Sequence, residues 1–245
     1  MTGMVTALAA AAAGDAKSRT EDVDDFIYLI SHDARASIRA LIELPQWIED
    51  DLRSDGVVLG GGISRSIEMM NQHAGRLDQM LVDLLAYSRI GRIQTIDNID
   101  VSKALDDVMK NLNRAETFQI TRQINLPFVA MGDHDASLML HALIENAVKH
   151  HQGPHGHIRI RTQREGEMFR LTVSDDGPGI PAHLHARAMA PMTTLRPRDE
   201  VEGTGMGLAI VGKIASHYGG HMALSKAQDH EGGLQIDVVL PRRPT

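Results

Sequence analysis

The strongest constraint on the fold is a pair of apolar stripes near the N-terminus. Within each stripe the residues alternate at spacings of four and three, which is typical of a helix that buries one narrow face against partner helices. The first stripe, with Ser37 as its one polar member, comprises Val23, Ile27, Ile30, Ala34, Ser37, Leu41, Leu44 and Ile48. The second comprises Ile63, Ile67, Met70, Ala74, Leu77, Leu81 and Leu84. Residues 21–91 are therefore predicted to contain two long amphipathic helices.

A glycine-containing segment separates the two stripes. RSDGVVLGGG, residues 53–62, is expected to interrupt the helix, and Gly91 fits the C-terminal stop of the second one. The result is a helical hairpin, which by itself buries little apolar surface. A strict stripe on both helices predicts that two hairpins associate as a four-helix bundle, so the chain is expected to be a homodimer.

The rest of the chain mixes helical and alternating patterns. Helices are expected over 102–115, with Ser102 as N-cap, over 135–151, and after the glycines of GTGMG. Strands are expected at FQITRQI, on both sides of REGE, at HMALSKA and at GLQIDVVLP. Runs of strands with helices on one face predict an α+β sandwich over 98–243. The Ala-rich residues 1–20 are expected to be a flexible or partly helical leader.

Composition excludes several classes of protein. The formal net charge of -7 argues against a nucleic-acid binder that works by neutralising phosphates. The absence of cysteine excludes disulfides and cysteine-based zinc sites, and it favours a reducing compartment. No run of 18 apolar residues occurs, so no membrane span is expected and a cytoplasmic location is predicted.

Three motifs in the second part suggest contact with a nucleotide. Glycines in GTGMG, residues 203–207, would let backbone N–H groups at a helix start approach phosphates. SDDGPGI, residues 174–180, places an acid at a strand end, where it could accept a hydrogen bond from a purine amino group. ENAVKH puts Asn146 and Lys149 on one helix face, as a Mg²⁺ ligand and a phosphate contact. Each glycine motif alone is explained equally well as a structural turn, and ENAVKH alone is better explained as a polar helix surface.

A fourth feature, SHDARASIRAL, lies within the first stripe. His32 falls at the heptad position farthest from the stripe, so it is expected to face solvent, with Asp33 beside it. An exposed neutral imidazole is a good nucleophile near neutral pH. Most single histidines in helices are ordinary surface residues, so this feature alone favours that explanation.

Taken in order, the four features resemble the sensor histidine kinases of two-component signalling from Asp24 to Pro241. The family implies a dimeric hairpin followed by a GHKL-type (Bergerat) ATPase fold. It also implies a bacterial protein kinase that uses Mg-ATP to phosphorylate His32, with Asp33 activating the imidazole. The phosphoryl group would pass to an aspartate of a response-regulator receiver domain, and a separate sensor protein would supply the input.

The resemblance also assigns the nucleotide site. Asn146 would coordinate Mg²⁺, Asp175 would bind the adenine amino group, and a lid over about 183–202 would carry Arg196 and Arg198 toward the γ-phosphate. The implied nucleotide-binding residues are Asn146, Lys149, His150, Asp175, Gly177, Gly179, Gly203, Thr204, Gly205, Gly207 and Leu208.

Several positions depart from the family pattern. Ser37 stands where a proline is usual, and Ala36 stands where members that dephosphorylate their partner often have Thr or Asn, so weak phosphatase activity is expected. ALIENAVKH, residues 142–150, resembles the family's N box, and Ala142 stands in place of its first asparagine. The lid segment MAPMTTL lacks the usual aromatic residue. Two alternatives therefore stay open: a histidine phosphotransferase with a degenerate ATP site, and an interaction module of the same ATPase superfamily. HHQGPHGH, residues 150–157, is interpreted as a solvated loop rather than a metal site.

Overall fold

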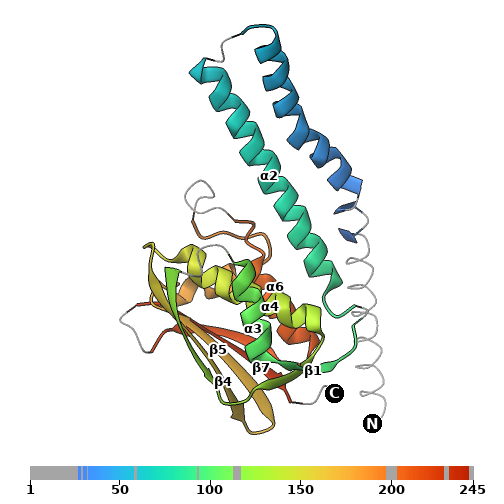
Figure 1. The fold of residues 1–245 in the computed structure, drawn as a ribbon. Helices are drawn as coiled ribbons and strands as arrows, with labels where there is room; N and C mark the ends of the chain where they lie inside the picture. Colours follow the sequence, from blue (N-terminus) through green and yellow to red (C-terminus); the bar gives the residue numbers. More distant parts are fainter. Residues whose placement is uncertain are drawn as a thin grey trace. The chain divides into compact units, whose positions relative to one another are not determined.

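The computed structural model describes residues 27–28, 30–31, 33–57, 60–92, 94–112, 117–196, 203–228 and 232–242. The chain divides into two compact units, Met1–Arg89 and Ile90–Thr245 (Figure 1). The predicted phosphoacceptor His32 lies outside the described residues, as do the leader over 1–20 and Arg198.

The first unit is a helical hairpin, as the two stripes predict. Residues 33–54 are helical, and α2 (Gly61–Arg89) returns alongside them (Figure 1). The antiparallel arrangement brings the two open ends together: Arg89 donates a 3.3 Å hydrogen bond to the hydroxyl of Tyr28. The same guanidinium lies 4.9 Å from the centroid of the Tyr28 ring, a cation–π distance.

Neither apolar stripe is buried along its whole length. Ile67 and Ala74 of the second stripe are buried. On the first helix the buried residues include Ile38 and Pro45, which lie outside the predicted stripe. The large stripe residues that stay exposed are Ile30, Leu41, Leu44, Ile48, Ile63, Met70 and Leu77. Each helix therefore has one apolar face inside the hairpin and a second, uncovered one, because an isolated hairpin supplies only one neighbour per helix.

The second unit is an α+β sandwich with a five-stranded sheet. In space the strands follow the order β2 (Phe118–Ile124), β4 (Gly156–Glu165), β5 (Met168–Asp175), β7 (Leu234–Pro241) and β6 (His221–Lys226). Only the β2–β4 pair is parallel. All five strands and the β4–β5 hairpin fall where the alternating patterns predict them.

Three helices cover one face of this sheet: α3 (Val101–Asn111), α4 (Asp133–His150) and α6 (Gly207–His217) (Figure 1). Between them lies the core, in which large side chains with at most 1% exposure include Leu105, Met139, Leu143, Ile144, Ile160, Leu171, Val211, Ile214 and Val238. The strand register places Asp175 opposite Ile158, whose side chain is 1% exposed. A carboxylate thus ends β5 on the face of the sheet that the helices cover.

Two local predictions for this unit need correction. Asp100, not Ser102, is the N-cap of α3, because its carboxylate accepts hydrogen bonds from the backbone N–H groups of Ser102 and Lys103. A two-stranded sheet of β1 (Asp97–Asp100) and β3 (Phe128–Met131) was also missed.

The segment after α2 packs into the second unit. Gly91 donates its N–H to Asp135 over 3.0 Å, and its positive φ of 76° places it so close to His217 that a Cβ would lie 2.1 Å from the imidazole. Asp135 is fully buried and also accepts a 2.9 Å hydrogen bond from the hydroxyl of Tyr218. Gly91 is thereby held within this unit, and the predicted domain bounds, 21–91 and 98–243, stay predictions.

Candidate functional site

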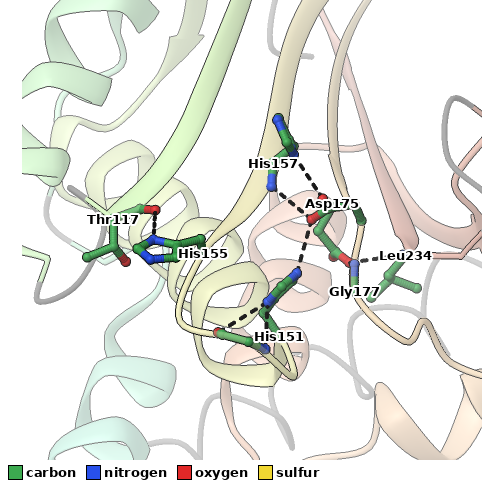
Figure 2. Close-up of polar contacts among 9 residues, drawn as sticks. Thr117, His151, His155, His157, Asp175, Gly177 and Leu234 are labelled. Carbon is green, nitrogen blue, oxygen red and sulfur yellow. Dashed lines mark hydrogen bonds and ion pairs between the residues drawn. The ribbon is translucent and has the colours of Figure 1, made fainter.

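The candidate nucleotide site is centred on Asp175, at the end of β5. The residue is 8% exposed, and one carboxylate oxygen, Oδ1, accepts hydrogen bonds from the backbone N–H groups of Gly177 (2.9 Å) and Leu234 (3.2 Å) (Figure 2). These two donors fix the orientation of the carboxylate and leave its Oδ2 able to accept from a bound group. Such an oxygen suits the exocyclic amino group of a purine.

Burial raises the pKa of Asp175, and the N–H groups of Leu234 and Gly177 oppose this shift. The adjacent Asp176 carboxylate adds a further upward shift, whereas His151 acts to lower the pKa. The charge of Asp175 therefore depends on the groups around it, which is typical of functional carboxylates.

Closely packed glycines hold the loop after Asp175. Gly179 has a φ of 68°, and a Cβ there would lie 2.7 Å from the carbonyl oxygen of Gly233. Gly233 has a φ of 88°, and its Cβ would lie 1.9 Å from the carbonyl oxygen of Asp175. Sequence reasoning singled out Gly177 and Gly179 but missed Gly233 and Leu234, whose EGGL segment gave no signal beyond two adjacent glycines.

The second group of candidates brings α4 and the GTGMG loop together. Asn146 and Lys149 are both half-buried on α4, and a Cβ at Gly203 would lie 3.0 Å from the Nζ atom of Lys149. Lys149 also lies 3.8 Å from Glu145, a loose ion pair. The lysine ammonium therefore lies beside the glycine loop, where a phosphate contact is predicted.

The GTGMG loop leads directly into α6. No side chain caps this helix, whose first residue is Gly207, so its first N–H groups can donate hydrogen bonds to a bound anion. Gly205 has a φ of 74°, and a Cβ there would lie 2.4 Å from the carbonyl oxygen of Thr193 in the predicted lid. Thr204 and Leu208 are buried and hold the loop rather than presenting polar atoms to solvent.

His150 and Arg196 connect the end of α4 with the predicted lid. Although part of His150 reaches solvent, the protein around its ring, together with the charges of Lys149 and Arg196, lowers its pKa to about 4. His150 is thus neutral near pH 7, and Arg196 supplies positive charge on this side of the site.

The hairpin candidates flank His32, which lies outside the described residues. Asp33, Ala36 and Ser37 are exposed on the first helix, whereas Ser31, the neighbour of His32, is buried. The roles assigned to His32 and Asp33 stay predictions.

Most of the histidine-rich segment is exposed, as expected for a solvated loop, but two of its histidines contact Asp176. His151 is only 12% exposed at its side chain, and its Nε2 lies 3.2 Å from Asp176 Oδ1; His157 Nδ1 lies 3.0 Å from Asp176 Oδ2 (Figure 2). Within the described ranges, no group of three or more His, Asp or Glu side chains could hold a metal ion. Asp176 lies 19 or more residues away in sequence from each of these histidines, so no local pattern connects them.

Comparisons with known proteins agree with this geometry. Residues 133–244 match the family described as histidine kinase-, DNA gyrase B-, and HSP90-like ATPase. The chain is 30% identical over 190 residues to the sensor histidine kinase CpxA of Escherichia coli K12, which covers 74% of this chain and 40% of CpxA. It is 28% identical to cyanobacterial phytochrome A of Nostoc over 86% of this chain and 28% of that protein.

Solved structures show the same fold. Full-length ShkA in complex with AMPPNP gives a TM-score of 0.65 at 19% identity, covering 90% of this chain and 46% of ShkA. The catalytic domain of the histidine kinase ThkA gives 0.52 at 21% identity, covering 61% of this chain and 97% of that domain.

These matches define residues 133–244 as a GHKL-type ATPase domain. With the helical hairpin and the matches to CpxA and other named kinases, the chain belongs to the sensor histidine kinases of two-component signalling. It spans less than half the length of the curated relatives named above. No helix among the described residues is long and apolar enough to cross a membrane.

Proposed function

We propose that the chain is an ATP-dependent protein-histidine kinase that phosphorylates its own His32 and passes the phosphoryl group to an aspartate of a response-regulator receiver domain. The observation that carries this proposal is the hydrogen bonding of the buried Asp175 carboxylate. Two backbone N–H groups saturate one oxygen of this carboxylate and leave the other able to accept from the adenine amino group.

The remaining contacts fit the phosphate end of ATP. Lys149 lies against Gly203, and the uncapped start of α6 follows at Gly207, so an ammonium group and backbone N–H groups lie near one loop. The side-chain oxygen of Asn146 is the candidate ligand for Mg²⁺, which would neutralise phosphate charge when bound.

In the transfer itself, a neutral ring nitrogen of His32 attacks the γ-phosphorus, the bond to the β–γ bridging oxygen breaks, and ADP leaves. Asp33, exposed beside His32, would accept the hydrogen bond of the other ring N–H and stabilise the cationic phosphohistidine. Arg196 would steady the γ-phosphate from the lid. Catalysis of this kind consists mainly of positioning and charge neutralisation.

The uncovered apolar face of the hairpin supports the proposed homodimer. A groove lined by residues of both helices, including Leu41, Leu44, Ile48, Met70 and Leu77, is almost wholly apolar. Two such faces would cover each other in a four-helix bundle. Exposed apolar surface of this kind is unusual on a monomer.

Incubation with Mg-ATP labelled at the γ-phosphate tests the proposal against the phosphotransferase alternative. The wild type should take up label, and Asp175→Asn should reduce uptake roughly tenfold or more at subsaturating ATP, because the adenine contact is weakened. A chain that never takes label from ATP, yet takes it from a phosphorylated receiver domain, would establish the phosphotransferase instead.

A further inference from the structure

The proposed adenine contact is made by Asp175, but the next residue, Asp176, has three contacts of its own. Asp176 Oδ1 accepts a 2.8 Å hydrogen bond from the backbone N–H of His157, and Oδ2 lies 3.0 Å from Nδ1 of the same residue. Oδ1 also lies 3.2 Å from Nε2 of His151. One carboxylate thus joins the end of β5 to β4 and to the loop after α4.

The imidazole of His151 is held at both ring nitrogens. Nδ1 lies 3.0 Å from the backbone N of Gly153 and 3.3 Å from the carbonyl oxygen of the same residue. Nε2 faces a carboxylate oxygen, which only accepts, so the Nε2–H group donates to Asp176. The ring is further held edge-on against Phe118, with centroids 5.3 Å apart.

The packing around these groups leaves no spare room. A Cβ at Gly156 would lie 2.7 Å from His151 Nε2, 2.8 Å from the Phe118 ring and 2.9 Å from Asp176 Oδ1. Figure 2 shows His151 and His157 converging on the chain beside Asp175, whereas His155 turns away to the carbonyl of Thr117. We call His151, Asp176 and His157 the histidine–aspartate clasp.

The clasp affects Asp175 in two ways. First, it fixes the peptide that follows Asp175 and thereby the position of Gly177. The N–H of Gly177 donates a hydrogen bond to Asp175 Oδ1. It also places two histidine donors against the Asp176 carboxylate, which lower its pKa against the effect of burial. A loose and unpaired Asp176 would instead place an uncompensated negative charge beside Asp175.

From these contacts we infer that Asp176, held by His151 and His157, is a positioning residue that sets the orientation of Asp175 and thereby the preference for adenine over other purines. The inference rests on the proposed function, because it requires Asp175 to meet the 6-amino group of the base. Asp176 itself touches no nucleotide atom in this account.

Measurement of two dissociation constants tests this role: those of the full chain for ADP and for inosine diphosphate, by calorimetry with Mg²⁺ present. Inosine has an oxygen where adenine has the amino group, so the wild type should prefer ADP. Asp176→Ala should narrow this preference roughly five- to tenfold, by weakening ADP more than inosine diphosphate. Asp176→Asn, which keeps an acceptor for the His157 N–H, should restore much of it.

The matched control is Asp106→Ala. Asp106 is also an aspartate paired with a cation, Arg122 at 2.6 Å, but it joins α3 to β2. Its loss should leave the preference for ADP unchanged.

Equal weakening of both nucleotides by Asp176→Ala, or no change in either, would overturn the inference, since a merely structural residue would not alter the ratio. If Asp176→Ala does not fold, His151→Phe decides: it keeps the ring against Phe118 and removes the Nε2 donor. A narrowed preference in that variant supports the clasp, and an unchanged one overturns it. A wild type that binds neither nucleotide would refute the proposed function itself, which is a distinguishable result.

Discussion

Replacement of Tyr218 by Phe removes one hydroxyl from a buried polar cluster of the second unit. This hydroxyl donates to Asp135 Oδ2 and accepts from the backbone N–H of Gly132, both over 2.9 Å. The other oxygen of Asp135, Oδ1, is buried without a hydrogen-bond partner. The carboxylate therefore depends on Tyr218 and on the N–H of Gly91.

The expected loss follows from these contacts. A hydrogen bond to a charged group contributes about 1.5–3 kcal/mol, and an unsatisfied buried N–H costs about 1–3 kcal/mol. Because the two effects overlap in one cluster, Tyr218→Phe should lower the free energy of unfolding of the second unit by about 2–4 kcal/mol. Tyr28→Phe is the matched control, since its exposed 3.3 Å bond from Arg89 should contribute less than about 0.5 kcal/mol.

Urea denaturation at fixed protein concentration can assign the loss to one unit. Trp47, the only tryptophan, lies in the hairpin, so its fluorescence follows that unit, whereas circular dichroism follows both. Tyr218→Phe should shift the dichroism transition and leave the Trp47 transition in place. A loss below about 0.5 kcal/mol, or an equal shift in both signals, would refute the structural role assigned to this cluster.

Three further predictions concern the site and its titration. Gly233→Ala should destabilise the second unit by at least about 2 kcal/mol and weaken ADP binding, because the φ of 88° and the carbonyl of Asp175 leave no room for a Cβ. Gly212→Ala, inside α6, is the control: its Cβ would make only an ordinary 3.5 Å contact, so it should be neutral or stabilising in the same urea denaturation experiment. His150 should titrate near 4 by NMR, so stability should fall as pH decreases from 6.5 toward 4, and a His150→Gln variant that keeps the full loss would contradict this. Absorbance of tyrosinate should show Tyr218 ionising near pH 12, with stability lost between pH 10 and 12 and no such component in Tyr218→Phe.

Periodicity in the sequence predicted the hairpin and all five strands of the large sheet, because these elements carry several repeats of their pattern. It could not predict which stripe residues are buried within the hairpin and which stay exposed. A heptad pattern identifies apolar positions but not the neighbour that covers each one. Ile38 and Pro45 became hairpin contacts, whereas Leu41 and Leu44 stayed uncovered. β1 and β3 were missed because four residues are too few to show alternation.

Within the candidate site, the motifs identified residues that act through local geometry. Asp175 and Gly177 are two residues apart, and the turn between them can be recognised from the sequence. The Asp135–Tyr218 pair spans 83 residues and the His157–Asp176 pair spans 19, so only the folded chain brings them together. Asp100 and Ser102 lie two residues apart and are equally good N-cap residues. Sequence alone therefore does not show which of them caps α3.

The central claim, that the ATPase unit phosphorylates His32, is tested most directly by locating the phosphate. The full chain is incubated with Mg-ATP labelled at the γ-phosphate, quenched in alkali, and digested for mass spectrometry of the peptide that contains His32. The account predicts acid-labile phosphate on His32 of the wild type and none on His32→Gln, although His32→Gln still binds ADP. Label on the His32→Gln chain equal to that of the wild type would contradict it.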